Sequence, residues 1–393
     1  MITALLAKVF GRLPIGWLQL RHNLTRLVTA VGGVTFANVL IFMQLGFMNA
    51  LFETSVMTHR MLDAEVIVAS SDFRSMREAN PMPRSRAWQA MTIEGVEDVI
   101  PMYLGQMFWT NPLTDDTTQF RVIGVDPDQQ VFTVPKLQAQ LSQLREPDTA
   151  LVDRKTRDFD PEIEQQLAKG ERLEIEMSGR RLTLIGMFAQ GASFADDGSL
   201  IVSDQTFLRL FPQRKPGTPT LLLLKTDPSW KPETLAATIN QQFPEADAKA
   251  FSKSAFIDAE QSYQARQTPI GFVFGFGVAI GLVVGLVIVY QVLSTDVQDH
   301  LSEYATFKAM GYAPRFFLSV VFEEALCLAA LGFIPGFLIT NVLYVIAAKV
   351  TSLPIEMPWS RPLFVFVLTA VMCTASGAIA TRRLNSADPA DLF

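Results

Sequence analysis

The sequence predicts a membrane protein with four transmembrane α-helices and a large extracytoplasmic α+β domain between helices 1 and 2. A membrane-spanning helix needs about 20 apolar residues, and four stretches qualify: 27–52, 269–293, 316–347 and 362–380. The stretch between the first two is as polar as a water-soluble domain and contains no such run. The mean hydropathy of +0.24 fits this mixture, since it is too high for an ordinary soluble protein. The 393 residues leave room for more than one folding unit.

Residues 1–26 predict a cytosolic amphipathic N-terminal helix. Its apolar residues alternate with Lys8, Arg12 and Arg21, so the segment can lie in the membrane interface with these bases toward anionic headgroups. The alternative is a basic leader that only fixes the topology. A cleaved signal peptide is not expected, because the first long apolar run is longer than the roughly 7–15 residues of a signal-peptide core.

The first span, 27–52, carries three amide side chains and no formal charge. Asn38 and Asn49 are close to three helical turns apart and project from nearly the same face, whereas Gln44 points roughly 120° away from Asn38. Amide groups at this depth are expected to form hydrogen bonds between helices. Contact with a substrate is the alternative.

Residues 53–268 predict a periplasmic α+β domain, because strand-like and helix-like pieces mix without a strict βαβ rhythm. Strands are expected at 65–69, 99–108, 119–125, 172–177, 181–188, 199–202 and 220–225. Helices are expected at 84–92, 161–168, 204–211, 232–242 and 254–267. A sub-domain inserted at about 127–211 is a further interpretation.

The second span, 269–293, is rich in glycine at intervals of four residues. Small residues at this spacing let a neighbouring helix approach closely, which predicts tight helix packing and carries no chemistry. The residues concerned are Gly271, Gly275, Gly277, Gly281 and Gly285.

The third span, 316–347, contains Pro335, which is expected to kink the helix. Glu323 and Glu324 lie near its start. Adjacent residues point about 100° apart on a helix, so these carboxylates cannot both face one partner. We expect them at the cytosolic boundary, where water or a basic partner is available; a proton relay is the alternative.

Basic residues flank one side of the four spans. The positive-inside rule places that side, and with it the N- and C-termini, in the cytoplasm. We therefore expect a multi-pass protein of the cell inner (plasma) membrane. Its connector at 294–315 is then a cytosolic coupling helix and loop, 348–361 is a short periplasmic loop, and 381–393 is a cytosolic tail. The flanking bases are Lys8, Arg12, Arg21, Arg26, Lys308, Arg315, Arg382 and Arg383.

Several kinds of chemistry are not predicted. The net charge of −6 argues against nucleic-acid binding. There is no G-x-x-x-x-G-K-[ST] phosphate loop, so we expect this chain to bind no cofactor and to leave ATP and Mg to a partner ATPase. Two cysteines in apolar runs and three histidines without H-E-x-x-H spacing predict no metal site. An enzyme with its active site in the outer domain would need a nucleophile–base or metal-ligand spacing that is not found.

Two local patterns have plainer explanations than catalysis or metal binding. Asp299, His300 and Ser302 are triad residues by type, but as sequence neighbours in the connector they predict a solvated helix face. Asp196-Asp197-Gly198 lacks the alternating oxygen ligands and final glutamate of a calcium loop, so a tight turn is expected.

The connector QDHLSEYATFKAMGYAPRFF, at 298–317, resembles the cytosolic coupling segment of FtsX/MacB-like ABC transporter permeases. In that family a glutamate, a small run and K-A-x-G-Y/A precede the next membrane helix. The tail NSADPADLF is similar to the family's D-P-x-E-x-L ending. A departure is Ser302-Glu303-Tyr304, which stands where many members have a basic R-x-x-E-I/F phrase.

A closer resemblance is to DevC-type permeases of the cyanobacterial heterocyst-type exporter. It is carried by four segments: RHNLTRLVTAVGGVTFANVLIFMQLGFMNALF, LIGMFAQGASFADDGSLIVSD, TDVQDHLSEYATFKAMGY and ADPADLF. The resemblance implies a homodimeric permease that binds a separate DevA-like ABC ATPase subunit. It also implies a DevB-like membrane-fusion adaptor and a TolC-like outer-membrane protein, which together export glycolipid or other envelope material by movement of the outer domain.

The connector is therefore expected to dock on the ATPase. The expected coupling contacts are Glu303, Tyr304, Lys308, Met310, Gly311 and Tyr312. The alternative function is a non-transporting FtsX-like scaffold that regulates an envelope hydrolase and needs no adaptor.

Overall fold

The computed structural model describes residues 14–110, 117–177, 179–243, 247–300, 306, 310–311 and 314–385. The chain divides into two compact units, each taken by itself below. The helical unit comprises the residues up to Asn49, Phe272–Ala347 and the residues from Ile355 on. The sheet unit comprises Ala50–Gly271 and Ala348–Pro354.

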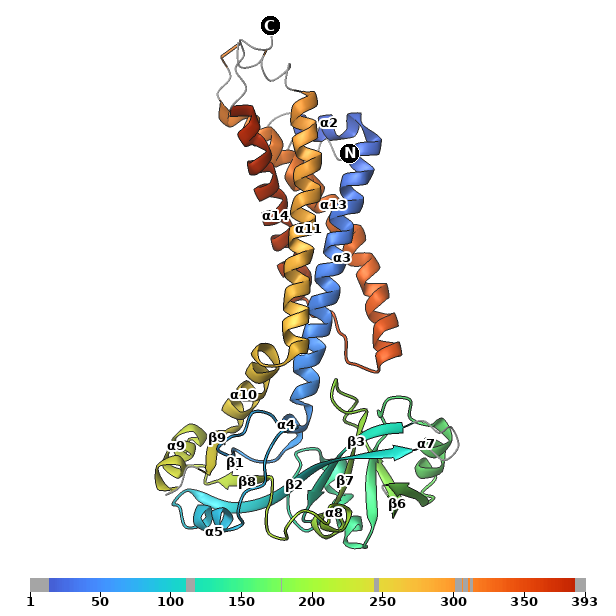
Figure 1. The fold of residues 1–393 in the computed structure, drawn as a ribbon, viewed down its shortest axis with the longest axis vertical. Helices are drawn as coiled ribbons and strands as arrows, with labels where there is room; N and C mark the ends of the chain where they lie inside the picture. The colour runs from blue at the N-terminus through green and yellow to red at the C-terminus, as the bar shows by residue number, and fades with distance from the viewer. Residues whose placement is uncertain are drawn as a thin grey trace. The chain divides into compact units, whose positions relative to one another are not determined.

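Four long helices run alongside one another in the helical unit (Figure 1). They are α3 (Leu24–Ser55), α11 (Pro269–Asp299), α13 (Pro314–Thr351) and α14 (Ser360–Asn385), and the short α2 (Ile15–His22) precedes α3. Each long helix contains a candidate membrane span: Leu24–Ser55, Pro269–Asp299, Leu318–Thr351 and Ser360–Thr381. The four predicted spans are thereby confirmed. α11 begins at its predicted residue, and the other helix ends lie a few residues beyond the predicted limits.

The long helices are apolar on their outer faces as well as between one another. Val283, Val345 and Leu363 are more than half exposed, which a bilayer tolerates and water does not. Between the helices, side chains such as Val34 and Leu328 are fully buried. Pro335 lies inside α13, which is one continuous helix, and the kink remains a prediction.

The described strands of the sheet unit form one nine-stranded sheet with the order β3-β7-β4-β6-β5-β2-β8-β1-β9. The strands are β1 (Val66–Ser70), β2 (Val96–Thr110), β3 (Thr117–Val125), β4 (Thr149–Asp153), β5 (Leu173–Met177), β6 (Arg180–Phe188), β7 (Gly198–Ser203), β8 (Leu221–Thr226) and β9 (Ala248–Ser252). All seven predicted strands are present. β4 and β9 were not predicted.

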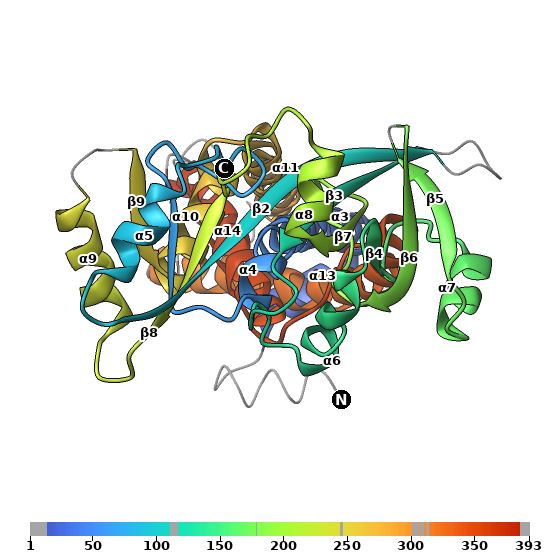
Figure 2. The same ribbon diagram turned by 90° about the horizontal axis from the view of Figure 1, so that it is seen from below.

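Strands β2 to β7 close into a ring, because β3 also pairs with β2. The last step of the ring, from β5 to β2, is a single pair between Met177 and Trp109. β8, β1 and β9 extend the sheet from the other part of β2, where Met102 pairs with Leu221. Figure 2 shows β2 running from the end of the sheet unit near α9 to the end near α7.

Short helices complete the sheet unit, and the five predicted ones are all present. The described helices are α4 (Met57–Met61), α5 (Ser85–Met91), α6 (Pro135–Gln138), the 3₁₀ helix η1 (Leu141–Arg145), α7 (Pro161–Ala168), α8 (Asp204–Leu210), α9 (Pro232–Gln242) and α10 (Lys253–Arg266). Side chains fix several of their starts: Ser203 accepts a hydrogen bond from the Thr206 N–H, and Ser252 accepts one from the Ala255 N–H.

The central strands are buried on both faces, so they are continuously apolar. In β8, Leu222 and Leu224 join one core cluster while Leu221 and Leu223 join another. This follows from the two-residue period of a strand. Both faces of the sheet unit therefore depend on the same few strands.

The sub-domain interpreted at about 127–211 starts too late in the sequence. The ring includes the segment from Met102 to Val125, whose two strands pair along their length. β2 is a single strand of 15 residues that serves both halves of the sheet unit, so no break in the pattern marks the boundary.

We predict that Leu223→Ala destabilises the sheet unit by about 2–5 kcal/mol, because the fully buried side chain leaves a cavity in a two-sided core. Urea unfolding of the purified chain in detergent measures this. Phe108→Ala in β2 is the control, since Phe108 is 58% exposed and should cost less than about 1 kcal/mol. Equal losses in the two variants would contradict the assignment of the core.

Candidate functional site

Two polar sites stand out in the described structure, one in each unit. In the helical unit, an acidic cluster of Asp296, Asp299, Glu323 and Glu324 gathers around Arg26. The Arg26 guanidinium donates to Asp296 Oδ1 over 2.9 Å and also pairs with Asp299. The Asp296 side chain is only 3% exposed, whereas that of Asp299 is 53% exposed.

The Arg26 pairs connect the first turn of α3 to the last turn of α11. A buried ion pair is costly to break from one side, because it leaves an unpaired charge away from water. These two helices are therefore fastened together at the end where α11 leads into the connector.

Helix α2 packs across α13 beside this cluster. The Trp17 backbone N–H donates to Glu323 Oε1 over 3.3 Å. A methyl group added at Gly16 would lie 2.8 Å from Glu324 Cγ, so the two helices touch closely at this point. Trp17 and Leu20 are buried among the side chains of the helical unit.

These contacts bear on two expectations. Trp17 and Leu20 of the N-terminal segment pack on protein, whereas Leu18 is 46% exposed. Glu323 and Glu324 are fully buried, so of the two expected surroundings, water and a basic partner, only the second applies. The sequence could not reveal this, because the residues that cover the glutamates come from α2, about 300 positions earlier.

Most of the predicted coupling contacts lie outside the described residues: Glu303, Tyr304, Lys308 and Tyr312. The two that are described follow a helical turn. The Met310 N–H donates to the Thr306 carbonyl over 3.0 Å, and Gly311 has a φ of +91°, which is typical of a helix end. The Met310 side chain is 60% exposed. An exposed apolar side chain at a helix end is a suitable contact for a partner.

The predicted packing glycines do not all behave alike. A methyl group added at Gly281 would lie 2.9 Å from Ile41 Cγ1, and one at Gly285 would lie 2.9 Å from Ala37 Cβ. Gly277 likewise abuts Gln44, so three of the five glycines face α3. Gly275 has no heavy atom within 4 Å of an added methyl group, and Gly271 belongs to the sheet unit and faces the Gln264 carbonyl.

The predicted amides also differ from one another. Asn38 is fully buried and accepts a hydrogen bond from the Thr369 hydroxyl of α14 over 2.5 Å. A methyl group added at Gly336 of α13 would lie 2.9 Å from Asn38 Cβ. Asn38 thus connects three helices. Gln44 and Asn49 are half-buried.

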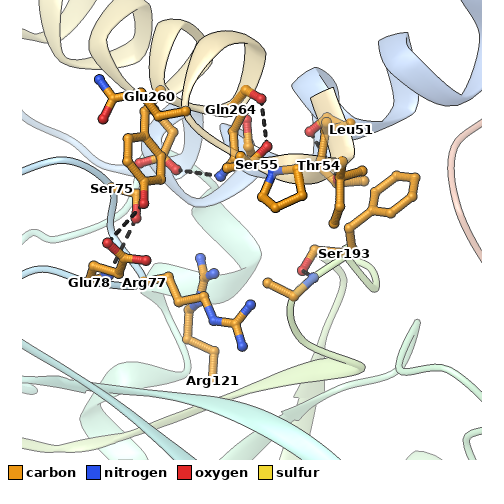
Figure 3. A pocket seen from close by; sticks show the side chains of 17 residues that line it. Leu51, Thr54, Ser55, Ser75, Arg77, Glu78, Arg121, Ser193, Glu260 and Gln264 are labelled. Atoms are coloured by element: carbon orange, nitrogen blue, oxygen red, sulfur yellow. Dashed lines mark hydrogen bonds between the residues drawn. The ribbon is translucent and has the colours of Figure 1, made fainter. Parts of the chain in front are cut away.

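In the sheet unit, a cavity of about 230 Å³ lies where the chain enters from α3 and leaves into α11. Its wall contains the last turn of α3, the loop after β1, strand β3, the loop between β6 and β7, and α10 with the residues that follow it. Figure 3 shows the Arg77 and Arg121 side chains extending into this cavity. The cavity is hereafter the entry cavity.

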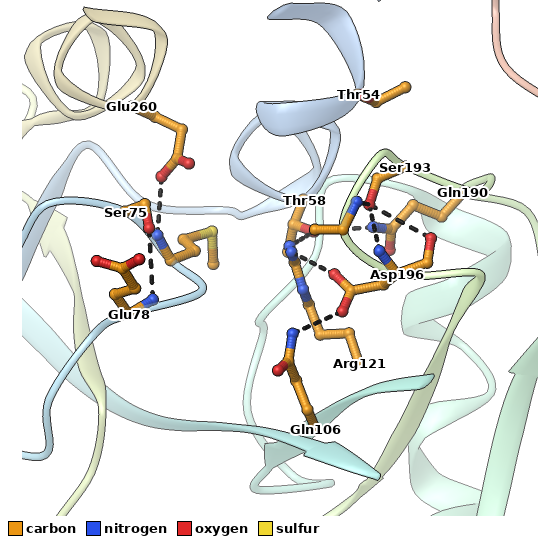
Figure 4. A network of polar contacts seen from close by, with 12 residues as sticks. Thr54, Thr58, Ser75, Glu78, Gln106, Arg121, Gln190, Ser193, Asp196 and Glu260 are labelled. Carbon is orange, nitrogen blue, oxygen red and sulfur yellow. Dashed lines mark hydrogen bonds and ion pairs between the residues drawn. The ribbon is translucent and has the colours of Figure 1, made fainter. Parts of the chain in front are cut away.

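Arg121 is held in place by a buried network (Figure 4). Its guanidinium pairs with Asp196 over 2.5 Å, and Asp196 is 4% exposed. Gln106 Nε2 donates to the same carboxylate over 2.8 Å, and the Asp196 N–H donates to Ser193 Oγ over 2.8 Å. The arginine is therefore rigidly positioned.

No local sequence pattern indicates this role for Asp196. The chain bends between Ser193 and Asp196, where the Ser193 N–H donates to the Asp196 carbonyl over 2.8 Å, which is the reverse of a tight-turn hydrogen bond. The bend also directs Asp196 toward Arg121 and Asp197 toward Arg157, at 2.6 Å. Both partners are distant in sequence, so no local pattern could identify them.

A second pair joins the segments that enter and leave the sheet unit. His59 of α4 and Glu260 of α10 are buried, and their Nε2 and Oε2 atoms are 3.5 Å apart. Glu260 also accepts the Met76 N–H over 2.8 Å, and the His59 ring lies 4.9 Å from that of Phe256. Burial lowers the pKa of His59, so the imidazole is neutral near pH 7.

A scan against protein-family models matches the C-terminal part of the chain. Residues 275–389 match the family described as FtsX-like permease C-terminal. The match covers nearly all of α11 together with α13 and α14, and it includes the connector. A search of curated proteins finds no match.

Solved structures similar to this chain include outer domains of transporters. One is the extracellular domain of the noncanonic ABC-type transporter YknZ from Gram-positive bacteria, with 12% identity and a TM-score of 0.30 over 44% of this chain and 90% of that one. Another is the periplasmic region of MacB from Actinobacillus actinomycetemcomitans, with 10% identity and a TM-score of 0.32 over 49% of this chain and 91% of that one.

We predict that Arg26→Gln destabilises the helical unit by about 2 kcal/mol or more, because Asp296 is left buried without its cation. Thermal unfolding in detergent measures the loss. The double variant Arg26→Gln/Asp296→Asn should recover part of it. Asp299→Asn is the matched control and should cost less than about 1 kcal/mol, since Asp299 is exposed. A loss for Asp299→Asn as large as for Arg26→Gln would contradict this assignment.

We also predict that the sheet unit loses stability as the pH falls. His59 is neutral when folded and binds a proton near pH 6.5 when unfolded, so the free energy of unfolding decreases below about pH 6.5 until the folded-state pKa is reached. The slope can reach about 1.4 kcal/mol per pH unit. Melting curves between pH 5 and 7.5 test this. His59→Gln should remove this pH dependence, and His22→Gln should leave it unchanged.

Proposed function

We propose that this chain is the transmembrane permease subunit of a MacB-like ABC exporter that works by mechanotransmission. The observation that carries the proposal is the match of residues 275–389 to the FtsX-like permease C-terminal family. The four candidate spans, with a large α+β unit inserted between the first and second, support it. A separate ATPase subunit then supplies the ATP hydrolysis, with its own Mg.

The proposed mechanism starts at the connector after Asp299. ATP-driven movement of the partner ATPase pulls on the connector, and through Asp296 and Arg26 it moves α11 and α3 together. These two helices lead directly to α10 and α4, which the His59–Glu260 contact joins. Both attachments of the sheet unit thus receive the same displacement.

The remaining partners follow from the same proposal. The protein is a homodimer in the inner membrane, with both termini in the cytoplasm and the sheet unit in the periplasm. It works with a DevB-like adaptor and a TolC-like outer-membrane protein, and its cargo is glycolipid or other envelope material. The four apolar helices support a membrane location.

We predict that a DevA-like ATPase hydrolyses ATP faster in lipid nanodiscs when this chain is present, and that adding the adaptor raises or regulates the turnover further. The charge reversals Glu303→Lys and Lys308→Glu, made together, should abolish stimulation without preventing insertion. Arg74→Glu in the sheet unit is the control for a change of charge, and should leave stimulation intact.

The outcomes separate the candidate functions. Stimulation without any adaptor effect would favour the FtsX-like scaffold that regulates an envelope hydrolase. Absence of both complex formation and stimulation would contradict the assignment of the connector.

A further inference from the structure

We propose that the entry cavity binds the phosphate headgroup of an anionic amphiphile. The proposal needs only that α3 and α11 span a membrane. Its test therefore does not depend on whether this chain has an ATPase partner. The argument concerns charge, apolar surface and position along the chain.

The cavity offers guanidinium groups for an anion. Among the described residues, Arg77 is exposed and has no hydrogen-bond or ion-pair partner, and its side chain extends into the cavity beside Arg121 (Figure 3). Arg121 uses only part of its five-donor fork on Asp196 and Thr58. Two guanidinium groups that converge on one space suit a phosphate group, which accepts paired hydrogen bonds.

The acids of the cavity wall are already engaged by protein donors. Glu78 accepts the Tyr263 hydroxyl over 2.9 Å. Glu260 accepts the Met76 N–H over 2.8 Å and the Gln264 side-chain amide over 3.2 Å. Both carboxylates therefore bind within the wall. Arg77, in contrast, has no such partner among the described residues.

A second cavity extends the positive surface. It has a volume of about 190 Å³ and shares Arg77 and Arg121 with the entry cavity. Its wall adds Arg214, which is anchored by donating to the Leu104 carbonyl over 2.9 Å. Three guanidinium groups from three separate parts of the chain thus lie around adjoining spaces, and an anion between them would be held from several sides.

Another part of the cavity wall carries apolar side chains and belongs to the ends of two candidate spans. Leu51 lies in the final turns of α3, and Pro269 and Ile270 start α11. Phe194 adds an aromatic side chain. The ends of membrane-spanning helices lie at the level of the lipid headgroups. A ligand with a charged head and an apolar body matches both walls, whereas a free anion would use only one.

The test titrates the full-length chain in a neutral detergent with dioctanoyl phosphatidylglycerol, dioctanoyl phosphatidylcholine and inorganic phosphate, and follows binding by thermophoresis. We expect saturable binding of phosphatidylglycerol and much weaker binding of the other two. Arg77→Gln should weaken phosphatidylglycerol binding about ten-fold, the loss expected for a charge-assisted hydrogen bond. Arg77→Lys should bind phosphatidylglycerol with an affinity between those of the wild type and Arg77→Gln. Lysine keeps the positive charge but loses the paired donors of the guanidinium group.

Two further variants test whether binding takes place in the entry cavity. Arg74→Gln removes the same charge from the same loop at a position that does not line the cavity, and should bind normally. Gln267→Trp should block binding by filling the cavity from an exposed position. Equal loss in Arg74→Gln and Arg77→Gln, or wild-type binding in Arg77→Gln, would overturn the site. If inorganic phosphate bound as tightly as phosphatidylglycerol, the proposal that the ligand is an amphiphile would be overturned.

Discussion

The attachment of α3 to α11 is the constraint on which the rest of this structure depends. At one end, the nearly buried Asp296 holds Arg26 of the first helical turn. Along the length, Gly281 and Gly285 bring the backbone of α11 close to Ile41 and Ala37. Helices in a bilayer gain little from the hydrophobic effect, so close backbone approach and polar contacts must hold them together. Here both kinds of contact act on the same pair of helices.

The segments that join the sheet unit to α3 and α11 are also held to each other. Its entry through α4 and its exit through α10 are joined by His59 and Glu260, so the two chain segments cannot separate without exposing buried polar groups. Beyond this base, β2 belongs both to the closed ring and to the extension through β8. Both halves of the sheet unit therefore depend on this one strand.

Sequence patterns predicted the parts of the fold that depend on local regularity. Long apolar runs identified the four spans, and continuous or alternating apolar residues identified seven strands. β9, with the sequence AKAFS, was missed because alanine and lysine are poor strand formers. The five-residue β4 has little room for a pattern, although all of it is buried. The candidate sites could not be predicted in this way. Their contacts join residues that are far apart in the chain, and a single sequence does not show which residues pair. The pairs are Arg26 with Asp296, Trp17 with Glu323 and Arg121 with Asp196.

The chain enters and leaves the sheet unit at neighbouring points. That unit is therefore an insertion between two helices whose mutual contacts do not depend on it. An insertion of this kind can be exchanged as a unit. A different domain could occupy the same place if its two ends met at a similar spacing, and the helices would keep their mutual contacts. Evolution can then vary the inserted unit while retaining the contacts between the two helices, with the contact between His59 and Glu260 marking the place of exchange.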